Sequence, residues 1–309
     1  MTKLPIITIQ GPTAVGKSDI AFQLARRFNT EIISADSRKV YKFLDVGTAK
    51  PSKEKLAAVK HHLIDIINPD QQYNAGKFRE DAGKISENLI ADGKIPIVEG
   101  GTGFYIKTLL EGIFEAPDIP AKIRDNLTRV ADEKGTRYLH NYLASVDKKA
   151  TEKIDPNDTH RLIRALEVYE ATGKTITSFW KEQQLNEPYK SYEILVEMDR
   201  DDLYERINKR VDNMLNRGLL KEIESLFQKG YTKDDQGMNT VGYKEFYDFF
   251  EGKCELERCI EKIKQHTRNY AKRQYSWYRK IDFNLTIKNY DINLSKIYAT
   301  IEKWVSENK

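Results

Sequence analysis

Residues 1–110 alternate between short apolar runs and longer segments with helical periodicity. The runs at 6–9, 31–35 and 62–67 are apolar and predict short buried strands, while 95–101 reads as a strand followed by a turn. The segments 19–28, 74–94 and 104–110 carry apolar side chains on one helical face, with Gly93 as the stop of the second helix. This alternation predicts a parallel sheet that helices cover on both faces.

The pattern changes near Pro117. From 117 to 187 the periodicity is helical and predicts no strand; the clearest helix, "NDTHRLIRALEVYEATGK", has Asn157 or Asp158 as its cap and Gly173 as its end. Strand patterns return at 192–198 and 284–288, and helical patterns fill 201–228 and 255–281. We therefore expect a core domain built from 1–116 and 188–309, interrupted by an all-helical insertion domain at 117–187.

A glycine loop joins the first predicted strand to the first predicted helix. Its sequence, "GPTAVGKS", fits the phosphate-binding pattern G-x-x-x-x-G-K-[ST]. Backbone N–H groups of such a loop converge on anionic oxygens at a helix N-terminus, the lysine reaches the terminal phosphate, and the serine hydroxyl can bind Mg²⁺. The residues predicted to hold the anion are Gly11, Pro12, Thr13, Ala14, Val15, Gly16, Lys17 and Ser18. The loop predicts a P-loop NTPase-like α/β fold and a bound polyphosphate or diphosphate, with Mg²⁺ on Ser18, but it does not identify ATP.

Composition narrows the class of protein. The 309 residues are 39% hydrophobic and 32% charged, typical of a soluble globular protein. No run approaches about 18 apolar residues, and the first residues lack signal-peptide features, so we expect a cytoplasmic protein without a membrane span. Cys254 and Cys259 lack zinc-ligand spacing and are interpreted as ordinary thiols. The net charge of +4 does not by itself imply a nucleic-acid partner.

An acidic residue, Asp36, follows the second predicted strand. Ligands of open α/β sheets bind beyond the carboxyl ends of the strands, so Asp36 is expected to share one cleft with the glycine loop. Three roles are open for it: a Mg²⁺ ligand, a general base, or a cap for the next turn. Ser37, Arg38 and Lys39 follow directly, and their two cations suit an anionic partner.

The strand at 95–101 ends in "EGGTGFY". Its two glycines allow a ligand to approach the backbone closely, and Thr102 offers a hydroxyl at the same end of the sheet. A nucleotide hydrolase is expected to carry a magnesium-binding aspartate near such a strand, but the acid present is Glu99. This difference weakens the interpretation as a plain ATPase.

Positive charge gathers at 262–280, where "KIKQHTRNYAKRQYSWYRK" contains seven lysines and arginines and no acid. Cations interleaved with aromatic rings suit RNA, because cations contact phosphates and rings stack on unpaired bases. The candidate phosphate contacts are Arg268, Lys272 and Arg273. The alternative is a long helix with a solvated cationic face and its aromatic rings in the core. The same two interpretations apply to His160, Arg161 and Arg164, which share one helical face.

Taken together, several motifs resemble one family, the bacterial tRNA dimethylallyltransferases, also called isopentenyl-tRNA transferases. The motifs are "GPTAVGKS", "ISADSRKVYKFLDVGTAKP", "HHLIDIINP", "VEGGTGFYIKTLLEG", "NDTHRLIRALEVYEATGK", "VGYKEF" and "TRNYAKRQYSWYR". They occur in the family's order and cover about 15–280, and "DVGTAKP" and "RALEVY" are more specific than the phosphate loop. Glu99 departs from the small or apolar residue expected before the glycine pair.

The resemblance implies transfer of a dimethylallyl group from dimethylallyl diphosphate to the exocyclic N6 amine of the adenine 3′-adjacent to the anticodon, with release of diphosphate. It implies that the loop from Gly11 to Ser18 holds the diphosphate with Mg²⁺, that Asp36 is the general base, and that Arg217 adds charge near the diphosphate. The implied contacts with the anticodon stem-loop of tRNA are Asp36, Ser37, Arg38, Lys39, Thr102, Arg124, His160, Arg161, Leu162, Ile163 and Arg164. Thr102 is expected at the reaction channel, and the enzyme is expected to be a monomer.

Two other functions stay open from the sequence. The first is a small-molecule or nucleotide kinase with the insertion as a lid, which the basic and aromatic stretch disfavours because a small substrate does not need it. The second is a non-enzymatic RNA-binding ATPase switch, which Asp36 and Thr102 disfavour.

Overall fold

The protein is described by a computed structural model that covers residues 3–113, 119–182 and 187–308. It divides into two compact units, one from Met1–Glu111 with Glu187–Lys309 and one from Gly112–Asn186. Within the described ranges, no helix combines the length and the apolar character needed to cross a membrane.

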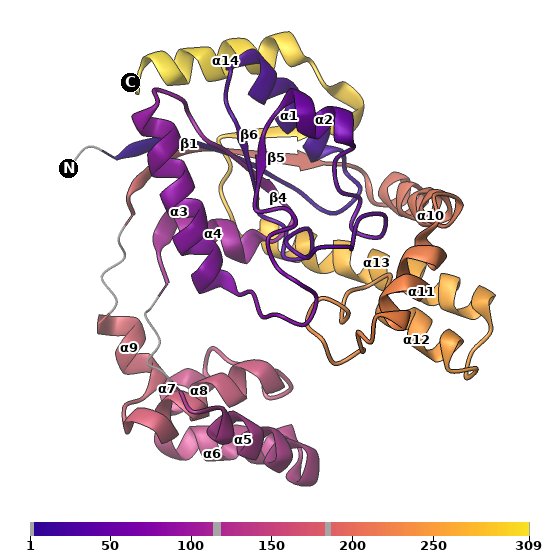
Figure 1. Ribbon diagram of the computed structural model, residues 1–309. Helices are drawn as coiled ribbons and strands as arrows, with labels where there is room; N and C mark the ends of the chain where they lie inside the picture. The colour runs from indigo at the N-terminus through magenta and orange to yellow at the C-terminus, as the bar shows by residue number, and fades with distance from the viewer. Residues whose placement is uncertain (1–2, 114–118, 183–186, 309) are drawn as a thin grey trace. The chain divides into compact units, whose positions relative to one another are not determined.

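The first unit is built on a six-stranded sheet in the order β3-β2-β4-β1-β5-β6 (Figure 1). All neighbouring strands are parallel, which confirms the predicted sheet. The strands are β1 (Leu4–Gln10), β2 (Ile32–Ser34), β3 (His61–His62), β4 (Ile97–Gly100), β5 (Tyr189–Glu197) and β6 (Leu285–Lys288). In the register, Gln10 lies opposite Gly100 of β4 and Leu195 of β5, so the glycine loop leaves the middle of the sheet beside the end of β4.

The strand predicted at 62–67 is wrong beyond its first residue. Leu63 and Asp65 have φ angles of 61° and 58°, in the left-handed region, and this breaks the extended chain after β3. The N–H groups of 65–67 instead donate to the carbonyl groups of Lys39 and Val40. Of the apolar side chains after β3, Leu63 is buried, whereas Ile66 is 39% exposed.

Helices of the first unit cover both faces of the sheet, with α1 and α14 on one side and α3 and α4 on the other (Figure 1). They are α1 (Lys17–Arg27), α2 (Lys53–Ala58), α3 (Ala75–Ala91), α4 (Gly103–Glu111), α10 (Arg200–Asn216), α11 (Leu219–Gln228), α12 (Lys244–Phe250), α13 (Leu256–Tyr278) and α14 (Leu294–Ser306), with a short 3₁₀ turn, η1 (Asn289–Asp291). The helical pattern predicted at 201–228 forms the two helices α10 and α11, which Gly218, with a φ of +93°, separates. The helices α2, α12 and α14 were not predicted from the sequence.

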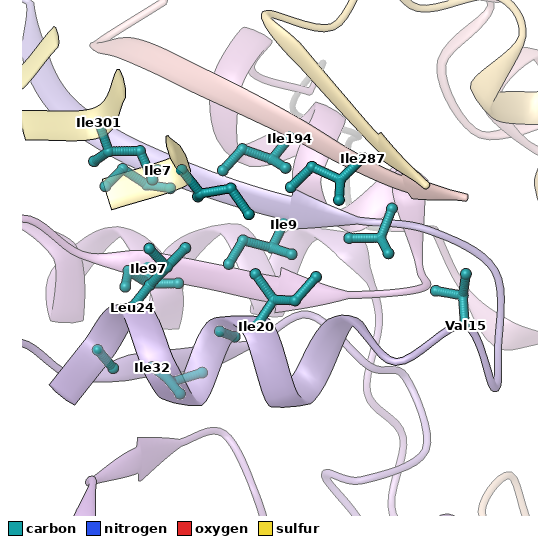
Figure 2. Close-up of a cluster of buried hydrophobic side chains, with 14 of the residues drawn as sticks. Ile7, Ile9, Val15, Ile20, Leu24, Ile32, Ile97, Ile194, Ile287 and Ile301 are labelled. Carbon is teal, nitrogen blue, oxygen red and sulfur yellow. The ribbon is translucent and has the colours of Figure 1, made fainter. Parts of the chain in front are cut away.

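The core beside the glycine loop is formed by aliphatic side chains of neighbouring strands and of α1 and α14 (Figure 2). Its labelled members are Ile7, Ile9, Val15, Ile20, Leu24, Ile32, Ile97, Ile194, Ile287 and Ile301. Burial of each such side chain contributes about 1.5–3 kcal/mol, so the end of β1 and the start of α1 are firmly held on both sides of the loop.

The second unit is helical throughout its described residues. Its helices are α5 (Ala121–Lys134), α6 (Thr136–Val146), α7 (Lys148–Thr151), α8 (Thr159–Thr172) and α9 (Ile176–Glu182). As predicted, α8 is capped by Asp158, whose side chain accepts a hydrogen bond from the N–H of Arg161, and ends at Gly173 with a φ of +70°. Its own apolar cluster includes Leu127, Leu139, Leu143, Leu162 and Leu166.

Candidate active site

The glycine loop is held open by contacts from distant parts of the chain. Gly16 has a φ of +99° and lies against the Asn289 amide, so a larger residue would be strained there. That amide donates to the carbonyl of Val15. Lys17 Nζ is 3.3 Å from the carbonyl oxygen of Pro12. The loop thus keeps its curled shape through its own backbone and through the segment after β6.

A basic cavity of about 510 Å³ lies in front of this loop. Its lining includes Gly16, Lys17 and Ser18, and the acid among its lining residues is Asp19. The cations that line it are Lys17, Lys39, Lys50, Lys55, Arg206, Lys209, Arg210 and Arg217. Arg217, predicted near an anion, therefore lies at the same cavity as the loop. The charge of this cavity suits a polyanion of the size of diphosphate.

Two cations of the basic cavity are held out of water. Burial lowers the pKa of Lys17, although the nearby carboxylate of Glu99 opposes the shift. Burial likewise lowers the pKa of Arg210, with Asp36 opposing it. A bound anion would raise the pKa of both groups again, because a nearby negative charge stabilises their protonated, charged forms. Sequence reasoning missed Arg206 and Arg210; they lie one turn apart on α10, and their cationic spacing was the available signal.

A second cavity, of about 380 Å³, adjoins the first, and we call it the inner cavity. It shares Lys17, Arg210 and Met214 with the basic cavity. Its apolar lining residues are Ile207, Val211, Met214, Leu219, Val241 and Ile263. Its polar lining residues include Thr13, Asp36, Ser37, Arg38, Tyr270, Arg273 and Gln274. An anion and a partly apolar group can therefore meet at the shared wall.

Asp36 is both the cap of a turn and a lining residue of the inner cavity. Its Oδ1 accepts hydrogen bonds from the N–H groups of Arg38, at 2.8 Å, and Lys39, at 3.4 Å, as a turn cap does. The residue also lines the inner cavity. Thr102 supports the same turn, because its Oγ1 accepts from the N–H of Ser37 at 3.1 Å. Burial raises the pKa of Tyr270 to about 12, and a hydrogen bond with Thr102 opposes that shift.

Glu99 is buried at the end of β4, with 3% of its surface exposed. Ser18 Oγ donates to its Oε1 at 2.9 Å, and Lys39 Nζ lies 3.8 Å from its Oε2. Lys39 was predicted to contact RNA, but it is only 7% exposed and its ammonium group faces the basic cavity and Glu99. Arg38, its neighbour, lines the inner cavity and donates to the carbonyl of Gln236.

The helix α13 is attached to the glycine loop by its inner face. Gln274 accepts from the N–H of Thr13 at 2.8 Å and donates to the carbonyl of Gly101 at 2.8 Å. Tyr278 Oη lies 3.3 Å from the carbonyl oxygens of Gly11 and Gly101. A Cβ at Gly101 would lie 2.5 Å from the Gln274 amide, which explains the second glycine of "EGG". Sequence reasoning missed Gln274, whose spacing of four from both Tyr270 and Tyr278 was the signal.

Exposed cations lie at the end of α13 and directly after it: Lys272, Arg273, Arg279 and Lys280. Arg273 also lines the inner cavity. Lys262 and Lys264 pair with Asp248 and Asp212, and Arg268 donates to Asn208 at 2.6 Å. Tyr278 is buried, and the Tyr275 hydroxyl bonds to the backbone of Met198. For these two rings the structure favours the alternative interpretation, rings in the core, because their hydroxyl groups find backbone partners inside the unit.

In the second unit, the predicted RNA contacts fall into two groups. His160 and Arg161 are exposed, and Arg161 lies 3.3 Å from Asp158. Leu162 and Ile163 are buried in the apolar cluster, so their side chains cannot form part of a surface.

Arg124 and Arg164 both bond to Glu167, a glutamate of α8 that is 1% exposed. Burial alone would raise the pKa of Glu167, but the two guanidinium groups lower it overall. These arginines therefore stabilise the unit in addition to any contact with RNA.

The cysteines are free thiols, as predicted, with Cys254 and Cys259 Sγ atoms 3.3 Å apart. Among the residues that the structure describes, no group of three or more His, Cys, Asp and Glu side chains is placed to hold a metal ion.

With this geometry in place, comparison with known proteins decides the family. The sequence signature of the IPP transferase family matches residues 39–281. The chain belongs to the IPP transferase family. A tRNA dimethylallyltransferase from Acetivibrio thermocellus is 45% identical over 279 residues, which are 90% of this chain and 89% of that protein. The resemblance stated from the motifs is thereby confirmed.

Solved structures agree with this membership. A crystal structure of tRNA delta(2)-isopentenylpyrophosphate transferase from Staphylococcus epidermidis matches with a TM-score of 0.72 and 38% identity, over 99% of this chain and 100% of that one. Crystallographic snapshots of a eukaryotic dimethylallyltransferase acting on tRNA match with a TM-score of 0.85 and 31% identity, over 99% of this chain and 80% of that one. The predicted P-loop NTPase-like α/β fold is confirmed.

The motif "DVGTAKP", the more family-specific part of the sequence, forms a wall of both cavities. The Glu222 carboxylate accepts from the N–H groups of Asp45 and Val46 at 3.0 and 2.8 Å, and from Tyr243 Oη at 2.6 Å. Gly47 and Thr48 then line the inner cavity, and Ala49 and Lys50 line the basic cavity. In this member of the IPP transferase family, the motif therefore forms part of the lining of both cavities.

Proposed function

We propose that this chain transfers the dimethylallyl group of dimethylallyl diphosphate to the exocyclic N6 amine of the adenine 3′-adjacent to the anticodon of tRNA, with release of diphosphate. One observation carries the proposal: the basic cavity and the inner cavity share Lys17 and Arg210. A leaving diphosphate and an acceptor base can thus meet across one cationic wall. Family membership and the tRNA dimethylallyltransferases it resembles support the same reaction.

The basic cavity stabilises the leaving group. As the allylic C–O bond breaks, negative charge grows on the diphosphate, and Lys17, Arg210 and the N–H groups of the loop stabilise that charge. The oxygens of Ser18 and Glu99, 2.9 Å apart, are of the kind that Mg²⁺ prefers and would hold it. When bound, Mg²⁺ supplies further positive charge to the departing diphosphate.

The inner cavity receives the acceptor. Its apolar residues suit the hydrocarbon group, and its volume of about 380 Å³ suits a single base that has left its stack. Asp36 accepts the proton that the amine loses as the new C–N bond forms. Its Oδ1 is fixed by the turn, which orients the carboxylate.

The tRNA binds to the exposed cations at the end of α13 and to those of α8. We take a monomer in the cytoplasm as the acting form. The test of the function is incubation with unmodified tRNA and labelled dimethylallyl diphosphate, followed by nucleoside analysis. Label on N6 of a single adenine beside the anticodon supports the proposal. Phosphoryl transfer from ATP without alkylation supports the kinase instead. A melting temperature that rises more with ATP than with dimethylallyl diphosphate and Mg²⁺ would also support the kinase.

Loss of two cations from α13 is expected to weaken tRNA binding in a salt-dependent way. In the double variant Lys272→Ala, Arg273→Ala, each lost phosphate contact should lower the slope of log affinity against log salt by about one unit. The measurement is tRNA affinity across a salt series. The matched control is Lys296→Ala with Lys303→Ala, two exposed cations of α14. Equal slopes in both double variants would place the RNA elsewhere.

Replacement of Gln274 by alanine is expected to loosen the glycine loop. Because Gln274 joins Thr13 to Gly101, its loss should reduce both diphosphate affinity and the single-turnover rate by roughly 10–10²-fold, the usual cost of a misplaced site. Affinity for tRNA should not change. Gln265→Ala, at an exposed position of the same helix, is the control. If both variants behave alike, Gln274 is not a positioning residue.

A further inference from the structure

A third cavity, of about 1050 Å³, lies between α4, the strands β1 and β5, and the end of α13. Its lining residues belong to the first unit, and among the described residues none lines both this cavity and either of the other two. It adjoins the base of the glycine loop, because Gln10, one of its lining residues, directly precedes Gly11. The transfer reaction does not account for this cavity.

Two buried polar groups at the third cavity have no hydrogen-bond partner among the described residues: Gln10 Oε1 and Trp277 Nε1. Gln10 is 1% exposed, and its side chain lies on the face of β1 opposite Ile7 and Ile9, because side chains alternate along a strand. The Trp277 indole lies against Gly103, where a Cβ would be 2.3 Å from Nε1. Buried polar groups are hydrogen-bonded in most native proteins, so an acceptor and a donor left over at one cavity indicate a polar ligand.

Glu193 of β5 brings a negative charge to the same cavity. In the sheet it lies opposite Thr8, two residues from Gln10. Its carboxylate accepts from two neutral donors, Gln10 Nε2 at 2.9 Å and Ser191 Oγ at 3.3 Å. Burial raises the pKa of Glu193, and the like charge of Glu111, which also lines the cavity, adds to that rise. A partly buried carboxylate with neutral partners is stabilised strongly by an added cation.

The four lysines that line this cavity do not supply that cation. Lys3 and Lys107 are paired with other glutamates, at 2.7 and 3.5 Å. Lys190 and Lys280 are exposed. In the described part of the chain no ion pair joins any of the four to Glu193. The cation that this carboxylate favours must therefore come from a ligand.

We propose that the third cavity binds a small aliphatic amino alcohol. Its ammonium group donates to Glu193 and to Gln10 Oε1, and its hydroxyl oxygen accepts from Trp277 Nε1. Its carbon chain packs on Ile106 and Leu110, two buried residues of α4 that line the cavity. An anion is disfavoured by the charge of Glu193, and a purely apolar ligand leaves the buried donor and acceptor unpaired.

The test titrates protein labelled with ¹⁵N at tryptophan with amino alcohols of two to six carbons. The readout is the NMR signal of the Trp277 indole N–H, which the variant Trp277→Phe assigns. We expect a saturable shift, because the hydroxyl oxygen accepts from this group. The diol of the same length should bind about 10–100-fold more weakly, since it lacks the cation, and the alkylamine about 2–10-fold more weakly, since it lacks the oxygen.

Glu193→Gln keeps the size of the side chain and removes its charge, so affinity for the amino alcohol should fall about 10–100-fold. The matched control is Glu187→Gln, the same change at an exposed glutamate of this cavity that pairs with Lys3, and it should keep the wild-type affinity. If Glu193→Gln does not fold, the comparison of amino alcohol with diol in the wild-type protein decides alone.

Three results would overturn the site: no shift of the Trp277 signal, equal affinities for the amino alcohol and the diol, or an unchanged affinity in Glu193→Gln. Any of them would leave Glu193 as a partner of Gln10 within the fold. The titration uses the protein without tRNA or diphosphate, so its outcome is independent of the proposed transferase function.

Discussion

Replacement of Lys17 by alanine is expected to slow dimethylallyl transfer by about 10²-fold or more, comparable to the loss of one preorganised electrostatic donor. Lys17 lies at the wall that the two cavities share, so its ammonium group is near the point where charge develops on the leaving diphosphate. Diphosphate affinity should fall in parallel. The measurements are single-turnover transfer to tRNA and calorimetry with diphosphate.

The buried position of Lys17 explains why this effect should be large. Desolvation lowers the pKa of the lysine in the empty protein, and the diphosphate favours its charged form. The matched control is Lys84→Ala, which removes the same charge from an exposed position on α3. This variant should keep the wild-type rate, because Lys84 is not buried beside the diphosphate. Near-normal turnover of Lys17→Ala would show that the loop does not stabilise the leaving diphosphate during the reaction.

The sequence was sufficient for the elements whose signal is local. The strands at β1 and β4, the loop between Gly11 and Ser18, and the cap and stop of α8 each depend on neighbouring residues and were predicted at nearly their observed bounds. Asp36 and the loop were expected in one cleft because parallel strands end at one edge, and both line the inner cavity.

Residues joined only by the tertiary fold could not be predicted in this way. Gln274 contacts Thr13 across 261 positions of the chain, and Arg210 reaches the loop from α10. The rings of α13 could not be assigned to RNA or to the core, because the sequence shows their spacing but not the backbone carbonyls that their hydroxyl groups meet. From its neighbours in the sequence, Lys39 was predicted to contact RNA at the surface. In the structure its ammonium group is instead paired with the buried carboxylate of Glu99.

Replacement of Asp36 by asparagine is expected to reduce the single-turnover rate by about 10²–10⁴-fold, the usual contribution of a general base. Asparagine keeps an Oδ1 that accepts from the N–H of Arg38, so the turn should persist. It loses the proton acceptor, and the amine then has no side chain to receive its proton. Affinities for tRNA and for diphosphate should stay near those of the wild type. The measurement is transfer in one turnover with enzyme in excess.

Two variants separate this role from the alternatives. Asp36→Ala removes the cap as well as the base, so it should also lower the melting temperature, whereas Asp36→Asn should not. Asp235→Asn changes another aspartate that caps a turn, through the N–H of Thr232 at 2.7 Å, and should keep the wild-type rate. If Asp36 is the base and Ser18 holds the metal, added Mg²⁺ should not restore the rate of Asp36→Asn. Recovery of the rate by Mg²⁺ would identify Asp36 as a metal ligand, and an unchanged rate in Asp36→Asn would leave it only as the cap of its turn.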